Sequence, residues 1–402
     1  MANMTRPRPF DGFKIAITDP TYFVGRTNLV ETLHRSPFEV HILLGGNRLG
    51  KTSTLRAIEW TLLDPESSVQ SRAFPVYVNL HKVQPKDSDS LRYILISSLR
   101  ESIVKWQRAP WEGIRKTYLR FLSEIVDADA NFGFLKLKIS NPERARQLDQ
   151  HQFEDELKRA ISDVEEHGFD GLCFLLDEAE FMVRSEWGND ACSYFRALKD
   201  SDAGIEPFLG LLFSGYRGVK EYQQSVGSPL YNIASVMWLN SLNESEVKEL
   251  IAIRTDQEEM TLAKSEVDFI WRTAGGHPHF TQQTLNLLLD CQKSKMPVSH
   301  QVLTFQLLQK YDHEFSRWWN KDNTNSNGFG VGERQVYRQL ITHKEGTFES
   351  LSEASNLPPL RVLDSLQVLA GTGVIRCTDS QTYTIGSELF EKWVVEHGGP
   401  EG

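Results

Sequence analysis

The sequence predicts an α/β protein in which a parallel sheet is flanked by helices and is followed by a largely helical region. Through about residue 240, strand-like apolar runs alternate with runs of helical periodicity, as in a parallel sheet covered on both faces. Beyond residue 240 the periodicity is helical alone, and after residue 330 three helical runs precede two short β patterns. The chain is therefore expected to divide into an α/β part and a helical part.

The composition is that of a folded globular protein. Of its 402 residues, 40% are hydrophobic and 24% are charged, and 44 Lys and Arg against 54 Asp and Glu give a net charge of −10. This acidity argues against binding a polyphosphate over the whole surface, although a local basic patch stays open. No apolar run approaches the ~18–20 residues that cross a bilayer, and no signal peptide is expected. Four scattered cysteines without a CxxC pair predict reduced thiols, so we expect a cytoplasmic protein with no membrane partner.

Four strand-like runs and the helices between them make up the α/β part. Residues 1–21 are Pro-rich and predict an irregular arm. The segment 107–150 resembles an insertion, and its residues 132–139 predict a strand or a hairpin arm. Strands are expected at 38–44, 74–80, 171–176 and 208–213, and helices at 27–34, 51–60, 91–106 and 153–167.

The helical part is expected to contain two units joined by a linker. The linker is the Asn/Asp/Gly-rich stretch 320–330, which separates a helical unit at 241–319 from a unit at 331–397, and the α/β part takes residues 22–240. Helices are predicted at 244–255, 264–273, 278–293, 302–319, 333–343, 348–355, 359–371 and from about 387, with strands at 374–377 and 382–385. Three helices followed by a two-stranded ribbon are the outline of a winged-helix domain.

The strongest chemical signal is the segment Gly45-Gly46-Asn47-Arg48-Leu49-Gly50-Lys51-Thr52, which fits the pattern G-x-x-x-x-G-K-[ST] of a P-loop, or Walker A motif. Its glycines allow backbone N–H groups to surround an anion at the start of the next helix. Lys51 would place a cation on the β- and γ-phosphates, and the Thr52 hydroxyl would bind Mg²⁺. The alternative is an ordinary glycine turn before an amphipathic helix, but the preceding strand and following helix favour nucleotide binding.

The second signal is an apolar strand that ends in two acids, Asp177 and Glu178. The carboxyl end of such a strand is where open α/β sheets bind ligands. Asp177 would hold the Mg²⁺ shell as a Walker B acid does, and Glu178 would orient or deprotonate the attacking water. By itself the pair is as well explained by a helix N-cap. Both motifs on one sheet predict a hydrolytic site.

Four further residues are candidates for contacts with the phosphates. Ser214 and Arg217 follow the next strand, where a polar side chain often faces the γ-phosphate; the alternative is a Ser-Gly turn beside a solvent-exposed arginine. Arg184 and Arg196 are weaker candidates, which would act on the nucleotide of a neighbouring subunit. The predicted catalytic residues are therefore Glu178, Lys51 and Arg217.

Three short segments together carry a family resemblance. Phe23-Val24-Gly25-Arg26, Leu175-Leu176-Asp177-Glu178 and Gly275-Gly276-His277-Pro278, with the Walker A loop, resemble the STAND and archaeal-type ATPases over about residues 22–395. These are AAA+-related proteins, so the resemblance implies a P-loop NTPase sheet followed by an all-α lid and a winged-helix domain. It also implies ATP or ADP with Mg²⁺ as cofactors.

The resemblance assigns a role to each part of the nucleotide site. Val24 and Gly25 would line the adenine pocket, and Gly276-His277-Pro278 would bring the lid against the nucleotide. The alternative is local helix punctuation, in which Gly275-Gly276 ends one helix and Pro278 begins the next, and both can be true. Thr52 and Asp177 would hold the metal. The remaining nucleotide contacts are expected from Ser214 and from the loop and the first helical turn, at Gly45, Asn47, Arg48, Leu49, Gly50, Lys51, Thr52 and Ser53.

The chain departs from the family pattern in three respects. The segment 107–150 is long, no lid arginine stands in the usual position, and the chain ends soon after the winged helix, whereas large STAND proteins carry a repeat sensor or a fused effector. We therefore expect the sensed or triggered component to belong to another polypeptide.

Charge argues against DNA as the main partner of the C-terminal unit. Residues 331–397 contain six Lys and Arg and nine Asp and Glu, and the expected recognition helix at 359–371 has one base, Arg361, among leucines. Phosphate contacts supply much of the affinity for DNA, so packing against the core, a protein partner or a homo-oligomer is favoured over DNA.

Three functions fit these expectations. The first is a slow ATP-hydrolysing switch that couples nucleotide state to movement of the lid and the winged helix, in a regulatory or defence system. The alternative is an AAA+-type DNA-associated ATPase, such as an initiator, a loader or a transposition protein. A scaffold with a degenerate P-loop is disfavoured because Lys51, Thr52, Asp177 and Glu178 are all present.

Overall fold

A computed structural model describes most of the chain. The described residues are 16–17, 22–64, 71–108, 148–200, 204–295, 299–320, 327–378 and 381–398. The strand or hairpin arm expected at 132–139 lies outside these residues, as do most of the N-terminal arm and most of the segment 107–150.

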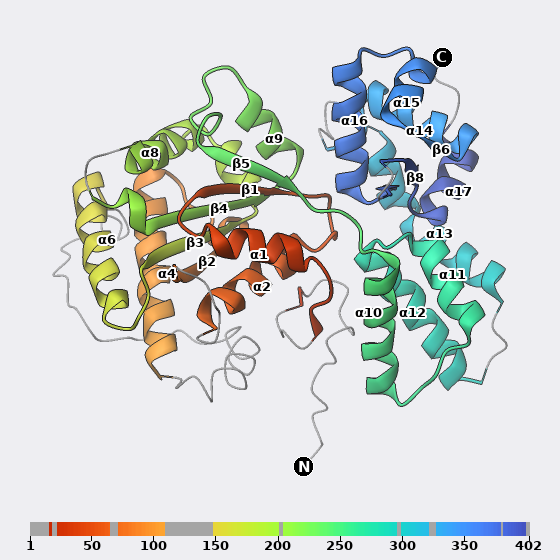
Figure 1. Cartoon of the computed structure of the whole chain (residues 1–402), viewed down its shortest axis with the longest axis horizontal. Helices are drawn as coiled ribbons and strands as arrows, with labels where there is room; N and C mark the ends of the chain where they lie inside the picture. The colour runs from red at the N-terminus through yellow and green to blue at the C-terminus, as the bar shows by residue number, and fades with distance from the viewer. Residues whose placement is uncertain are drawn as a thin grey trace.

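The α/β part is built on a five-stranded parallel sheet, as predicted (Figure 1). Its strands lie in the order β2-β3-β4-β1-β5. Leu44, at the end of β1, lies opposite Gly215 and Trp238, while Asn79 lies opposite Asp177. The carboxyl ends of neighbouring strands therefore meet at one edge. The strands are β1 (Val40–Leu44), β2 (Ala73–Asn79), β3 (Gly171–Asp177), β4 (Leu209–Gly215) and β5 (Ala234–Trp238).

Helices cover both faces of this sheet, because alternate strand residues point to opposite sides. Leu43 and Cys173 pack with α1 and α2 on one face, whereas Ile42 and Phe174 pack with α4, α6 and α8 on the other. The helices of this part are α1 (Thr27–Arg35), α2 (Lys51–Leu63), α3 (Leu80–Val83), α4 (Ser88–Arg108), α6 (Gln150–Glu165), α7 (Glu180–Val183), α8 (Gly188–Asp200), η3 (Glu206–Phe208) and α9 (Arg217–Gln224).

The strand β5 and the helices α8 and α9 were not anticipated from the sequence. β5 lies at the edge of the sheet and is partly exposed along its length, so its sequence, Ala-Ser-Val-Met-Trp, lacks the continuous apolar run of the buried strands. The other four strands are each within two residues of the expected bounds at either end.

The C-terminal part is mostly helical. Four helices precede the expected linker: α10 (Glu244–Glu258), α11 (Lys264–Ala274), α12 (Pro278–Lys293) and α13 (His300–Trp319). Then follow α14 (Val331–His343), β6 (Glu345–Gly346), α15 (Phe348–Ser355), α16 (Pro359–Thr372), β7 (Ile375–Cys377), β8 (Tyr383–Ile385) and α17 (Glu388–His397). The three strands form an antiparallel sheet in the order β6-β8-β7. In the part of the chain that the structure describes, no helix is both long and apolar enough to cross a bilayer.

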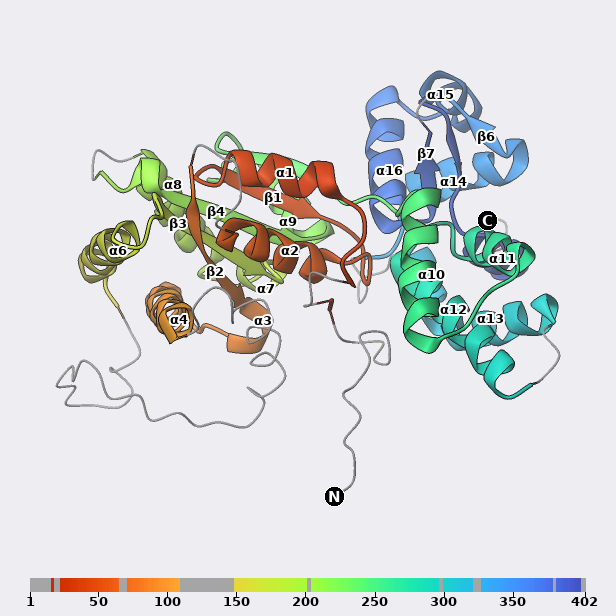
Figure 2. The same ribbon diagram turned by 60° about the horizontal axis from the view of Figure 1, so that its bottom comes forward.

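One aromatic core joins the helices on both sides of the linker. Phe280 and Phe315, from α12 and α13, pack in the same cluster as Phe390 of α17, and Phe329 from the linker segment is buried against Phe390. Because the cluster is shared, α12 and α13 are held firmly against α14–α17. Figures 1 and 2 show that α16 lies on the side of this part that faces the sheet.

Candidate functional site

The loop between β1 and α2 has the backbone that its glycines predict. Gly50 has φ +99, and an added Cβ there would lie 2.6 Å from Arg26 Nη1. Arg48, at the tip of the loop, also lies in the left-handed region with φ +61. The loop therefore passes directly into the N-terminus of α2, which begins at Lys51. The N-terminus of a helix at this position favours an anion.

The Lys51 ammonium and the Gly46 N–H, both in this loop, donate hydrogen bonds to backbone carbonyls. Lys51 is 8% exposed, and its Nζ donates hydrogen bonds to the carbonyl oxygens of Gly45 and Gly46 at 2.9 and 3.2 Å. The backbone N–H of Gly46 donates to the carbonyl oxygen of Gly371, at the end of α16, over 2.6 Å. A P-loop donor is thus bonded to the C-terminal part of the chain.

Asp177 lies at the centre of a hydrogen-bonded cluster at the sheet edge. It is fully buried and accepts hydrogen bonds from the hydroxyls of Thr52 at 2.7 Å, Tyr77 at 2.8 Å and Ser214 at 2.5 Å. The two predicted metal ligands, 125 residues apart, are therefore in direct contact. Tyr77 was not singled out from the sequence, although its position near the end of β2 was a usable signal. Ser214 reaches the site through Asp177.

Glu178 follows Asp177 and has an unusual backbone. Its φ of +57 lies in the left-handed region, which is strained for a residue with a side chain. Residues with such strained backbones are concentrated at functional sites. Burial raises the pKa of its carboxyl, which nearby Lys51 partly offsets and Asp177 reinforces. A carboxyl with a raised pKa, beside the loop and lining a cavity, is suited to accept a proton from water.

Arg217 does not lie in solvent, so that alternative from the sequence was wrong. It is 6% exposed, and its guanidinium donates to Glu333 of α14 over 2.8 Å. Burial lowers the pKa of Arg217, but Tyr216 and Glu333 more than compensate and leave it above its usual value. Lys220 forms a second ion pair with Asp364 of α16. The helix α9 thus holds the C-terminal part through two ion pairs.

The two weaker arginine candidates have partners outside the cluster around Asp177. Arg184 donates a hydrogen bond to Asn327 at 3.0 Å. Arg196 is paired with Asp200 on the outer surface of α8 at 3.2 Å. Their action on the nucleotide of a neighbouring subunit stays a prediction.

The segment that precedes α1 joins the loop to the lid helices. Val24 packs in the core of α10–α12, and a Cβ on Gly25 (φ +75) would lie 2.6 Å from the Glu246 carboxylate. The Arg26 guanidinium donates to the Leu49 carbonyl and, at 3.2 Å, to Thr54. Burial lowers the pKa of Arg26 to about 10, and Glu246 counteracts that effect. Arg26 was quoted only as part of a sequence signature, yet it links loop and lid.

His277 and Pro278 begin α12 beside the end of α16. Pro278 occupies the first turn of the helix, as its fixed φ favours. His277 is buried and stacks on Phe280, and a Cβ on Gly373 would lie 2.9 Å from its ring. Burial, together with His279 and nearby arginines, lowers the pKa of His277 well below its usual value, so the ring is neutral.

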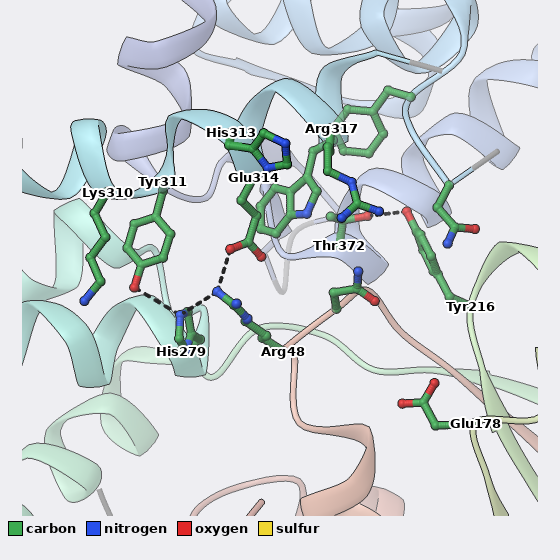
Figure 3. Close-up of a pocket in the computed structure, with 14 residues that line it drawn as sticks. Arg48, Glu178, Tyr216, His279, Lys310, Tyr311, His313, Glu314, Arg317 and Thr372 are labelled. Carbon is green, nitrogen blue, oxygen red and sulfur yellow. Dashed lines mark hydrogen bonds and ion pairs between the residues drawn. The ribbon is translucent and has the colours of Figure 1, made fainter. Parts of the chain in front are cut away.

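A cavity of about 650 Å³ opens between the loop tip, Glu178 and α13 (Figure 3). Arg48 crosses its edge, donating to Glu314 at 2.5 Å and to the His279 ring at 3.1 Å. Burial lowers the pKa of His279 to about 3, and the positive charges of Arg48 and Lys310 contribute. Of the predicted nucleotide contacts, Asn47 and Arg48 face this cavity.

The donor set fits a nucleotide with its metal. A hydroxyl and a carboxylate, from Thr52 and Asp177, are oxygen ligands of the kind that Mg²⁺ prefers, and they are already in contact. Lys51 and the loop N–H groups supply the positive end for phosphates. These residues would hold Mg²⁺, which would supply positive charge to the phosphate oxygens.

Comparisons with known proteins show the fold. A scan against protein-family models and a search of curated proteins each found no match. Among solved structures, the Walker-type ATPase PABY2304 of Pyrococcus abyssi is similar at 16% identity and a TM-score of 0.57, over 96% of this chain and 100% of that one. The ORC2 protein of Aeropyrum pernix is similar at 13% identity and a TM-score of 0.47, over 97% and 98%. The likeness to the first structure shows that this chain shares the α/β P-loop fold of that protein.

Proposed function

We propose that this chain is an ATP-binding, slowly hydrolysing ATPase in which nucleotide state controls the docking of the C-terminal part. The observation that carries the proposal is the 2.7 Å contact between Thr52 and Asp177. It brings the Walker A loop and the acid of β3 together at the sheet edge, where α/β folds bind ligands. Support for ATPase activity comes also from the fold shared with a Walker-type ATPase.

Each residue of the site has a part in hydrolysis. Lys51 and the loop N–H groups bind the phosphates, while Thr52 and Asp177 hold Mg²⁺, which supplies positive charge to the phosphate oxygens. Ser214 and Tyr77 fix the orientation of Asp177 through their hydroxyls. Glu178 accepts the proton of the attacking water, and its raised pKa favours that transfer near neutral pH.

The coupling to the C-terminal part runs through Gly46. Its N–H is bonded to the Gly371 carbonyl, so a phosphate that uses this donor must displace the end of α16. ATP and docked α16 then compete for one group, and each weakens the binding of the other. Arg217 and Lys220 of α9 set the strength of docking through their ion pairs.

The domain division predicted from the sequence is part of this proposal. We assign residues 22–240 to the ATPase core, 241–319 to the lid and 331–397 to a winged-helix domain, in which α14, α15 and α16 are followed by β7 and β8. A STAND-like role in regulation or defence, an output through a protein partner or a homo-oligomer, and a cytoplasmic location stay predictions.

A DNA-associated ATPase of the AAA+ type is the second candidate, and it is supported at least as well as the switch. The observation that favours it is the element order of residues 331–397, since α16 stands where winged-helix proteins carry a recognition helix. An electrophoretic shift assay at low salt, with and without ATP, separates the two candidates. DNA binding that weakens steeply with salt and DNA-stimulated hydrolysis favour the second.

Two variants test the ATPase proposal itself. Lys51→Ala is expected to weaken binding of Mg·ATP by at least about tenfold, because it removes a charge-assisted contact to phosphate. Glu178→Gln is expected to keep binding and to lose hydrolysis. Calorimetry and a phosphate-release assay on the full chain measure both. Wild-type protein that binds no nucleotide, or Lys51→Ala protein that binds it unchanged, contradicts the proposal.

A further inference from the structure

The strand β5 forms one edge of the five-stranded sheet and pairs on one side only, with β1 (Figure 1). Within the part of the chain that the structure describes, no further strand lies against its other side. A free strand edge presents a row of N–H and C=O groups that can pair with another strand. β5 is therefore a surface on which a further strand can be added.

The backbone groups that point away from β1 belong to alternate residues of β5. The Leu239 N–H donates to the last carbonyl of β1 at 2.7 Å, whereas the Ala234 N–H points the other way and donates to Leu230 at 3.2 Å. Because the N–H groups of successive strand residues point to opposite sides, those of Val236 and Trp238 also point away from β1. Two donors and the carbonyls of the same residues therefore lie along the free edge.

This edge lacks the features by which proteins prevent strands from pairing. Edge strands are usually protected by charged residues, prolines or bulges. Residues 222–243, which contain β5, include no Asp, Glu, Lys or Arg, although 24% of the chain is charged. The strand at the opposite edge, β2, carries Pro75 and is largely buried. The edge at β5 is thus open to association in a way that the edge at β2 is not.

Apolar side chains near β5 are exposed to solvent. Val226, Tyr231 and Val236 are 106%, 59% and 39% exposed. A single exposed apolar residue is common on any protein surface and needs no explanation. Three of them in one uncharged segment, beside a free strand edge, indicate a surface that another protein covers.

The charge of the chain favours a second copy as the partner. The net charge is −10, so two copies repel each other over most of their surfaces. They can approach closely where neither surface carries charge, and residues 222–243 meet that condition. A different protein that recognised an acidic chain would gain from acids at the contact, and this segment offers it none.

The order of side chains in β5 also suits an antiparallel pairing of the strand with its own copy. A pairing centred on Val236 places this residue opposite itself, with its N–H and C=O facing those of the copy. Ala234 then lies opposite the partner's Trp238. Ser235 likewise lies opposite the partner's Met237. Each outer pair joins a small side chain to a large one, which fills the space between the strands without crowding.

We propose that this chain forms a homodimer through β5, which pairs with β5 of a second copy in antiparallel orientation about a two-fold axis at Val236. The two parallel sheets then join into one continuous sheet. The pairing uses the outward N–H and C=O groups of β5 and covers Val236 at its centre. The proposal needs no bound nucleotide, so it does not rest on the proposed function.

Charges placed at the two-fold axis test this pairing. Val236→Lys and Val236→Glu each bring two like charges opposite one another in the dimer. Because Val236 is 39% exposed, each variant is expected to fold as a monomer. Val395→Lys is the matched control, since Val395 lies on α17 and is 67% exposed. Circular dichroism melting verifies folding of all variants.

Size-exclusion chromatography with light scattering measures the mass of the full-length chain over a concentration series without nucleotide. Wild-type and Val395→Lys proteins should approach twice the chain mass of 46.0 kDa. Each Val236 variant should have a dimer dissociation constant at least about tenfold higher. An equimolar mixture of Val236→Lys and Val236→Glu should dimerise again, because opposite charges then meet at the axis.

Hydrogen exchange of the wild-type protein locates the contact independently of any substitution. The amides of Val236 and Trp238 should exchange more slowly at concentrations that favour the dimer than at concentrations that favour the monomer. If a Val236 variant melts early, this measurement decides alone.

Restored dimerisation in the mixture of Lys and Glu variants, with slowed exchange at β5, supports the proposal. A wild type that stays monomeric overturns it and leaves the edge of β5 to a strand of another protein. A dimer that both Val236 variants retain, or that their mixture does not restore, also overturns it. The same holds if the exchange of the Val236 and Trp238 amides does not depend on concentration.

Discussion

Substituting Gly371 by alanine should release the C-terminal part from the nucleotide loop. The Cβ that this change adds to α16 would lie 2.6 Å from Trp238 Cζ3, far inside van der Waals contact. Overpacking of this kind costs about 1–3 kcal/mol. The displaced helix end also loses the hydrogen bond from Gly46, which contributes about 1 kcal/mol.

These two effects together weaken docking by about 2–4 kcal/mol, or roughly 30-fold to 1,000-fold. Because docked α16 and phosphate compete for the Gly46 N–H, affinity for Mg·ATP should rise by up to the same factor, until docking no longer limits binding. Isothermal titration calorimetry of Gly371→Ala measures this gain. Adding Trp238→Leu to the variant makes room for the Cβ and should return the affinity toward the wild-type value.

The reasoning fails if Gly371→Ala binds Mg·ATP with unchanged or lower affinity while it remains folded. A gain in affinity that Trp238→Leu does not reverse would place the effect elsewhere in α16. Competition for the Gly46 N–H requires that Gly371→Ala raise the affinity for Mg·ATP and that Trp238→Leu, added to it, reverse at least part of that rise.

Three further predictions concern ionisable groups. Burial in the folded protein raises the pKa of Glu178, so ionisation of this carboxyl destabilises the folded state as the pH rises through that pKa. Glu178→Gln should therefore raise the melting temperature at pH 7–8, with no gain near pH 4. Burial lowers the pKa of His279 to about 3, so below about pH 6.5 the unfolded chain takes up a proton that the folded chain does not, and the folded state loses stability. His279→Gln should remove about 2 kcal/mol of this acid destabilisation at pH 5, as measured by urea unfolding. An unchanged dependence of the unfolding free energy on pH would contradict this prediction. Removing Glu333 leaves Arg217 buried without its carboxylate, so Glu333→Ala should cost about 3–5 kcal/mol of docking, and Arg217→Met should recover part of it in a double-mutant cycle; additive losses would refute the pairing.

The sequence predicted the α/β fold and the central features of the site for a physical reason. The loop conformation requires glycines, and a buried strand ends in Asp177. Both features depend on neighbouring residues alone, so they can be recognised in the sequence. Their meeting at one sheet edge follows from the parallel topology. The contact of Thr52 with Asp177 is the geometric result of those rules.

The contacts that link the core to the C-terminal part were beyond sequence reasoning. Arg217 pairs with Glu333, which lies 116 residues away, and nothing local marks that partner. The hydrogen bond from the Gly46 N–H to the Gly371 carbonyl involves backbone atoms alone, so no residue type in the sequence indicates it. The edge strand β5 was missed because its exposed face lacks the apolar continuity of a buried strand.

Small-angle X-ray scattering with Mg·AMPPNP tests the central claim most directly. Wild-type protein should expand when the analogue displaces the end of α16 from Gly46, and should stay compact with Mg·ADP. Lys51→Ala protein should stay compact with both. Scattering from the wild type that does not change with either nucleotide, or an expansion that persists in Lys51→Ala, would contradict the coupling of the phosphate site to the C-terminal part.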